Sequence, residues 1–222
     1  MIRHYLFLTA ALFVSSAFAQ QPPELTDVSA SSYEAKAINN LVAQGIMTPV
    51  APGKFAPSAA MKRGDFALAL QRLFNLPAPD KPMKFSDVHP GDSAYAAIEA
   101  VAPYMDKQVP CPGCDIGSKF SPDAHVSRAE SAITLVRILI ARNKLQLLGD
   151  AECDKVLSSV PDSQGLPKRT RPYIATAIQA GILECCSGNT IESTQLLTRA
   201  DAAETIDKVQ RRFDIPLVKT GT

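Results

Sequence analysis

The feature that most constrains the fold of this chain is a pattern of residues that occurs three times along it. Each copy has an apolar opening, a stretch with apolar residues at helical spacing, a loop, and a second helical stretch that opens with an arginine motif. The three arginines are Arg63, Arg128 and Arg199. A helical hairpin of this size cannot cover its own apolar faces, so the pattern predicts three copies that share one core.

The copies are expected at residues 24–76, 84–148 and 156–213, followed by a tail at 214–222. Two segments between them, the proline-rich residues 77–82 and a looser stretch around 149–155, are predicted to be linkers. The sequence has no alternating strand pattern of useful length. The predicted fold is therefore all-α, with three helix-loop-helix repeats around a pseudo-threefold helical core.

The first 19 residues have the features of a secretory signal peptide. Arg3 and His4 precede an apolar run at 5–14, and small residues end the segment at Ala17-Phe18-Ala19. The apolar run is much shorter than the roughly 20 residues that span a bilayer. We expect a cleaved signal peptide and an exported chain without a membrane span in its mature part, located in the periplasm or at the cell envelope or surface.

Charge and motif content argue against several classes of function. The formal net charge is +1 and the isoelectric point about 7.6, which is not the basic footprint of a nucleic-acid-binding protein. We find no metalloprotease motif, nucleophile elbow or phosphate-binding glycine loop. The expectation is a non-enzymatic protein without a cofactor, and with no nucleic acid among its partners.

Short motifs in the first two copies resemble those of the S-layer homology family. In the second copy these are Asp87-Val88, a Gly-x-x-Phe-x-Pro loop at 117–122 and Ser127-Arg128-Ala129-Glu130. In the first copy they are Asp27-Val28, Gly45-Ile46 and a Gly-x-Phe-x-Pro loop at 53–57. The third copy retains Thr198-Arg199-Ala200-Asp201 but has Ser159 at the position of the aspartate and lacks the loop motif. The resemblance extends over residues 24–213.

The resemblance implies a module of the cell envelope whose partner is cell-wall polysaccharide or a peptidoglycan-linked polymer, in the best-understood cases through pyruvate-bearing sugars. The alternative is a degenerate repeat that acts as a periplasmic adaptor and binds other envelope proteins. Family members usually carry a tryptophan at positions where this chain has Tyr33, Ser93 and Tyr173. That difference favours the adaptor, whereas the three retained arginines favour polymer binding.

The arginine motif suggests where a ligand would bind. Ser127 with Glu130, and Thr198 with Asp201, have the spacing of a capping box. The arginine between them faces the positive end of the helix dipole, so it needs either an internal partner such as Asp27 or Asp87, or a bound anion. The candidate ligand-binding residues are Arg63, Arg128, Arg199, Asp27, Asp87, Tyr33, Tyr173 and Lys119.

Five cysteines in an exported chain predict disulfides rather than free thiols. A local bridge from Cys111 to Cys114 is favoured, and Cys153 would pair with Cys185 or Cys186, leaving one thiol over. A redox role for Cys111 and Cys114 is disfavoured because they precede a glycine-rich loop. A zinc site is disfavoured because adjacent Cys185 and Cys186 are poorly spaced for one tetrahedral ion.

Overall fold

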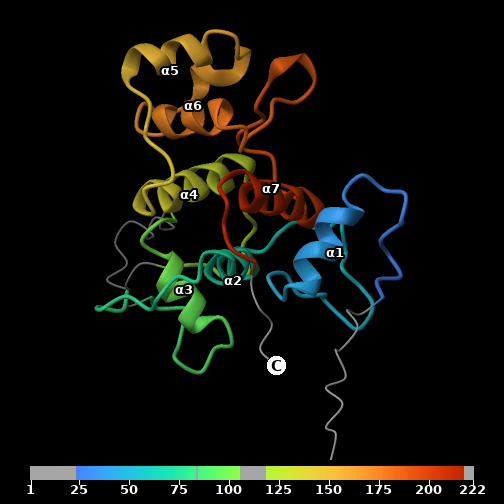
Figure 1. Ribbon diagram of the computed structural model, residues 1–222. Helices are drawn as coiled ribbons and strands as arrows, with labels where there is room; N and C mark the ends of the chain where they lie inside the picture. The colour runs from blue at the N-terminus through green and yellow to red at the C-terminus, as the bar shows by residue number, and fades with distance from the viewer. Residues whose placement is uncertain (1–23, 84, 106–118, 218–222) are drawn as a thin grey trace, which may run out of the picture.

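The structure, a computed structural model, describes residues 24–83, 85–105 and 119–217. Helices and connecting loops make up this part of the chain (Figure 1), and its extended pairing is limited to isolated bridges. The helices are α1 Ala35–Ala43, α2 Arg63–Phe74, α3 Tyr95–Val101, α4 Arg128–Ala141, α5 Asp150–Leu157, α6 Arg171–Gln179 and α7 Arg199–Arg212, with short turns η1 Pro161–Gly165 and η2 Ser187–Asn189. The predicted all-α class is confirmed. The predicted signal peptide at 1–19, Cys111 and Cys114 lie outside the described residues.

The apolar spacing that predicted the first helix is the spacing that α1 buries. Ile38 and Leu41 are fully buried and Val42 nearly so. The Gly-Ile motif then ends the helix, because Gly45 takes a left-handed φ of 66° and Ile46 donates its amide to the carbonyl of Leu41 at 2.9 Å. α6 ends in the same way, with Gly181 at φ 64° followed by Ile182.

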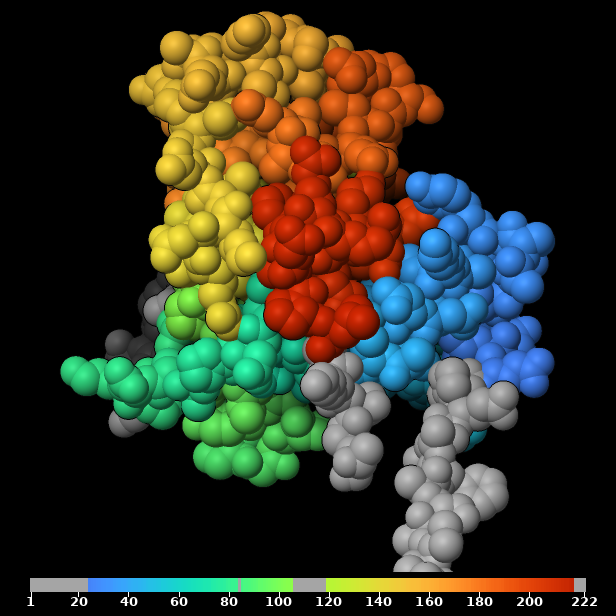
Figure 2. Space-filling view, viewed as in Figure 1, coloured from blue at the N-terminus to red at the C-terminus, as the bar shows by residue number. Residues whose placement is uncertain are grey.

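The principal helix packing joins different copies of the pattern. α3 packs on α2, α6 packs on α4, and α1 packs on α7 (Figure 1). The first helix of each copy therefore lies against the second helix of another copy. Helix α7, coloured red, occupies the middle of one face of the molecule with α1 beside it (Figure 2).

Three backbone hydrogen bonds join the segments that lead into α2, α4 and α7. The amide of Met61 donates to Leu197 at 2.8 Å, that of Leu197 to Val126 at 2.9 Å, and that of Val126 to Met61 at 2.9 Å. The three bonds close a ring, and the three side chains are buried. One apolar cluster extends from Leu25 to Val209 and includes residues of all three copies.

The predicted linker at 149–155 is wrong, because most of it forms helix α5. The carboxylate of Glu152 accepts the amide of Gly149 at 3.3 Å, and acidic residues occupy the positive first turn. Cys153 and Leu157, four residues apart, are buried, and α5 packs on α6. None of the helices in the described ranges has the length and apolarity to cross a membrane.

Candidate functional site

Two aspartates fix the loops that carry the Gly-x-Phe-x-Pro pattern. Each carboxylate accepts two consecutive backbone amides: Asp27 from Phe55 at 2.9 Å and Ala56 at 2.7 Å, and Asp87 from Phe120 at 3.0 Å and Ser121 at 2.8 Å. The amide of Phe55 lowers the pKa of Asp27. Both aspartates therefore hold a loop in place.

The third copy uses Asp162 for the same task, which the sequence analysis missed. Its carboxylate accepts the amides of Ile191 at 3.0 Å and Glu192 at 2.9 Å. Ser159, assigned to this position by sequence, instead donates to the carbonyl of Val156 at 3.1 Å. The third copy contains α5 and η1 before its first repeat helix, and its loop-binding aspartate lies in η1, three residues after the position expected from the pattern. A usable signal existed, since Asp162 is the sole carboxylate between Val156 and Leu183.

Each motif arginine reaches the aspartate-held loop of another copy. The Nε atoms donate to backbone carbonyls as follows: Arg63 to Phe120 at 2.8 Å, Arg128 to Ile191 at 3.0 Å, and Arg199 to Phe55 at 2.8 Å. Two guanidinium groups also lie over the aromatic rings of those loops, Arg63 at 4.8 Å and Arg199 at 4.7 Å from the ring centroids. The arginines thus link the first copy to the second, the second to the third, and the third to the first.

Two of these arginines are buried and neutralised. Arg63 is 0% exposed and pairs with Glu130, and Arg199 is 4% exposed and pairs with Asp65 at 3.4 Å. Burial lowers the pKa of Arg199, while Asp65 opposes that shift. The ion-pair partners are first-turn carboxylates of α4 and α2, and Asp27, which the sequence analysis suggested, is a nearby charge that raises the pKa of Arg199. Asp87 binds its own loop instead.

The pairing also decides which predicted capping boxes form. Thr198 and Asp201 form the full box: the Thr198 hydroxyl accepts the Asp201 amide at 3.1 Å, and the Asp201 carboxylate accepts the Thr198 amide at 3.2 Å. Ser127 accepts the amide of Glu130 at 3.2 Å, but the Glu130 carboxylate pairs with Arg63. That box is therefore half formed.

Arg128 differs from its two counterparts. It is partly exposed, and its Nη2 donates to the carbonyl of Glu184 at 2.6 Å. No carboxylate within the described ranges forms an ion pair with Arg128. The residue in the equivalent position to Asp65 and Glu130 is Asp201, and its carboxylate caps its own helix instead. Arg128 is therefore the motif arginine whose charge has no internal carboxylate partner in the described part of the chain.

A cavity of about 190 Å³ lies beside Arg128, between α4 and α7. Its polar wall includes Ser131, Asp201 and Lys208, and the last of these pairs with Glu184. We call it the Arg128 cavity. The remaining lining residues are Ile182, Leu183, Glu184, Cys185, Cys186, Leu197, Glu204 and Thr205.

Residues 24–67 match the family model of the S-layer homology domain. This range contains Asp27, the loop at 53–57, helix α1 and Arg63. This segment of the chain is similar to the S-layer homology domain. Such domains are non-catalytic modules that attach proteins to the cell envelope through cell-wall polymers, so this protein is associated with the envelope or surface. No curated protein matches the chain.

A second cavity, of about 520 Å³, lies at the start of α2, and six of its ten lining residues belong to the segment that matches the S-layer homology domain. Its cations are already neutralised: Lys62 pairs with Asp123 at 2.8 Å, and Arg199 pairs with Asp65. Asp123 raises the pKa of Lys62. This cavity is therefore less suited to an anionic ligand than the Arg128 cavity, because carboxylates already pair with its cations.

The other candidate residues occupy different surroundings. Tyr33 is 86% exposed and borders a cavity of about 150 Å³ between α1 and α7. Tyr173 is half-buried, with the guanidinium of Arg137 5.0 Å from its ring centroid, and Lys119 is exposed. Tyr33 therefore lies next to α7, and we call the cavity that it borders the Tyr33 cavity. Neither Tyr173 nor Lys119 lines the Arg128 cavity.

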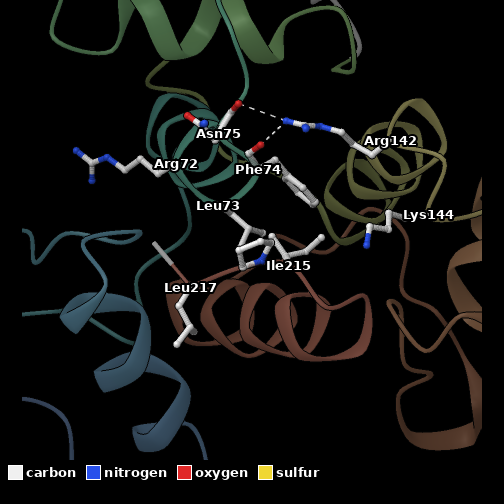
Figure 3. A pocket seen from close by; sticks show the side chains of 9 residues that line it. Arg72, Leu73, Phe74, Asn75, Arg142, Lys144, Ile215 and Leu217 are labelled. Carbon is white, nitrogen blue, oxygen red and sulfur yellow. Dashed lines mark hydrogen bonds between the residues drawn. The ribbon is translucent and has the colours of Figure 1, made fainter. Parts of the chain in front are cut away.

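Another cavity, of about 560 Å³, lies near the ends of α2 and α4 (Figure 3). Its two arginines bind backbone carbonyls at the ends of neighbouring helices. Arg142 donates to the carbonyls of Phe74 and Asn75 at the end of α2, and Arg72 donates to Gly45 at 2.9 Å. Cations at helix C-termini stabilise the unpaired carbonyls there.

The predicted pairing of Cys153 with Cys185 or Cys186 is wrong, because all three are free thiols. Cys153 is buried within α5, 3.6 Å from the carbonyl of Leu148, whereas the other two line the Arg128 cavity. The preferred bridge between Cys111 and Cys114 falls outside the described residues. Within them, no three acidic, histidine or cysteine side chains gather as a metal site would require.

Proposed function

We propose that this protein binds cell-wall polysaccharide or a peptidoglycan-linked polymer without catalysis, through the Arg128 cavity. One observation carries the proposal. Arg128 is partly exposed and faces a cavity without a described carboxylate partner, whereas Glu130 and Asp65 neutralise Arg63 and Arg199. An arginine in this state is suited to an acidic group of a polymer, such as the carboxylate of a pyruvate-bearing sugar.

The geometry leaves Arg128 able to form a paired contact with a carboxylate. Its Nε and one N–H of Nη2 are used by the carbonyls of Ile191 and Glu184. These two bonds fix the guanidinium plane, and the remaining N–H groups are available to a ligand. The first amides of α4 already donate to Gln195, Ser193 and Ser127, so the guanidinium is the group at this helix start that an anion can bind.

The Tyr33 cavity extends the proposed site along α7. Glu204 and Lys208 line both this cavity and the Arg128 cavity, so the two adjoin. Burial raises the pKa of Glu204 in their shared wall. We propose that a polymer lies along α7, with an acidic group at Arg128 and a sugar ring against the exposed face of Tyr33.

The same proposal assigns three S-layer-homology-like repeats at 24–76, 84–148 and 156–213 around a pseudo-threefold core. The cyclic helix packing, the ring of Met61, Val126 and Leu197, and the arginine contacts support it. A closed arrangement lets each repeat cover the apolar faces of its neighbours. The proposal also includes export by the segment at 1–19.

Sedimentation with purified wall sacculi tests the function. The full chain should pellet with intact sacculi, stay in solution with sacculi stripped of attached polymers, and bind less at higher salt because the contact is ionic. Equal pelleting with stripped sacculi would contradict polymer recognition. No pelleting with either preparation would favour the adaptor, which the missing tryptophans and the neutralised Arg63 and Arg199 support.

A further inference from the structure

Cys185 and Cys186 are adjacent free thiols in the wall of the Arg128 cavity. Both are partly exposed, whereas Cys153, the other cysteine in the described ranges, is 3% exposed. Two thiols side by side in a cavity can be reached by a small reagent, and neither is used in the fold as a disulfide.

The loop that carries these thiols also positions Arg128. Arg128 donates to the carbonyl of Glu184, one residue before the pair, and to the carbonyl of Ile191. Inside the loop, the Cys186 amide donates to Thr190 at 2.6 Å. A change in the backbone between Glu184 and Cys186 would therefore reach the guanidinium directly.

A disulfide between adjacent cysteines would impose such a change. Consecutive Cα atoms are about 3.8 Å apart across a trans peptide, whereas ordinary disulfides have a Cα separation of roughly 4.4 to 6.8 Å. A bridge at this separation is strained, and strained bridges are the ones that thiols readily reduce. The pair is therefore suited to reversible oxidation rather than to a permanent staple.

We propose that Cys185 and Cys186 form a redox-sensitive modification site that controls the Arg128 cavity and takes a low-molecular-weight disulfide as its oxidant. One thiol loses its proton and attacks the oxidant, forming a mixed disulfide and releasing one reduced thiol. The second cysteine then displaces the other half of the oxidant. The pair loses two protons and two electrons in total, and the oxidant is reduced to two thiols.

The consequence for binding rests on the proposed function. In the dithiol state the carbonyls of Glu184 and Ile191 hold Arg128 toward its cavity. Closing the bridge displaces the carbonyl of Glu184, so the guanidinium loses one of its two anchors. The dithiol is therefore the binding state, and the disulfide weakens polymer binding about tenfold, the effect of one hydrogen bond to a charged group.

The experiment treats the folded full chain with oxidised glutathione and maps its thiols by mass. The tryptic segment 170–199 contains Cys185 and Cys186 and no other cysteine. It should become lighter by two hydrogen atoms, and the amide of Cys186 should exchange faster once its bond to Thr190 is strained. Sacculus binding should fall and recover with dithiothreitol. The Cys153→Ser variant should respond like the wild type. The Cys185→Ser variant should show neither the loss of two hydrogen atoms nor the faster exchange at Cys186.

A segment 170–199 that stays fully reduced, or that carries glutathione without closing the bridge, would overturn the inference. A bridge that forms without faster exchange at Cys186 would also overturn it. Thiol mapping and amide exchange do not require a polymer, so they decide the inference even if the chain binds no sacculi. If binding occurs but oxidation leaves it unchanged, the control of the cavity is wrong while polymer binding stands.

Discussion

At the scale of single residues, three aspartates have the same role in three loops. Asp27, Asp87 and Asp162 each accept two consecutive amides, and the residue at the second amide has a left-handed φ of 57°, 57° and 47° at Ala56, Ser121 and Glu192. That conformation is uncommon for residues other than glycine, so the carboxylates stabilise a strained turn. The same turns present the backbone carbonyls that accept hydrogen bonds from the three motif arginines.

Asp162→Ala should lower the free energy of unfolding by about 1–3 kcal/mol, because the amides of Ile191 and Glu192 lose their acceptor. The matched control is Ser159→Ala, which removes an exposed hydroxyl and should change stability by less than about 0.5 kcal/mol. Urea unfolding of both variants measures the difference. Equal effects would contradict the assignment of Asp162 as the third aspartate.

Asp27 predicts part of the acid sensitivity of the fold. Its pKa lies below the ordinary value of 3.8 in the folded state, so it stabilises the fold above that value and loses this contribution as pH falls through the lower folded pKa. Asp27→Asn should therefore flatten the loss of stability below pH 3.8. Thermal melts from neutral to acidic pH measure this slope. A slope identical to that of the wild type would contradict a native carboxylate held by Phe55.

At the scale of elements, sequence periodicity predicted the helices of the three copies, but it predicted neither α5 nor the packing partners. The spacing of Ile38 and Leu41 and the glycine at 45 are local signals, so α1 and its end were predictable. α5 was missed because only Cys153 and Leu157 mark its buried face. The partners of Arg63 and Arg199 were missed because Glu130 and Asp65 lie in other copies, and spacing along one copy does not report contacts between copies.

The contact between α1 and α7 contains a polar group that should couple the two helices. Asn40 donates to buried Asp207 at 2.5 Å, beside a reciprocal amide pair of Gln44 and Gln210. Alanine substitutions at Asn40 and Asp207 should be non-additive by about 0.5–3 kcal/mol in a double-mutant cycle. Asn40→Ala combined with Lys155→Ala, an exposed change on α5, should be additive. Additivity in both cycles would contradict direct coupling of α1 to α7.

At the scale of the whole molecule, the proposed shared core predicts that each copy depends on the others for its packing. Deleting residues 157–213 removes α6 and α7, which are the packing partners of α4 and α1. The truncated chain should lose its cooperative transition, because those apolar faces become exposed. Calorimetry of the full and truncated chains measures this loss. A truncated chain that melts cooperatively near the temperature of the full chain would contradict a shared core.

The central claim, that Arg128 binds an acidic group of a wall polymer, is tested most directly by the affinity of Arg128 variants for soluble wall polymer, measured by titration calorimetry. Arg128→Ala should weaken binding roughly 10- to 100-fold, the loss of hydrogen bonds to a charged group. Arg128→Lys should restore little, because an ammonium cannot replace the planar fork. Lys155→Ala, an exposed cation on α5, should bind like the wild type. A folded Arg128→Ala variant with wild-type affinity would contradict the claim.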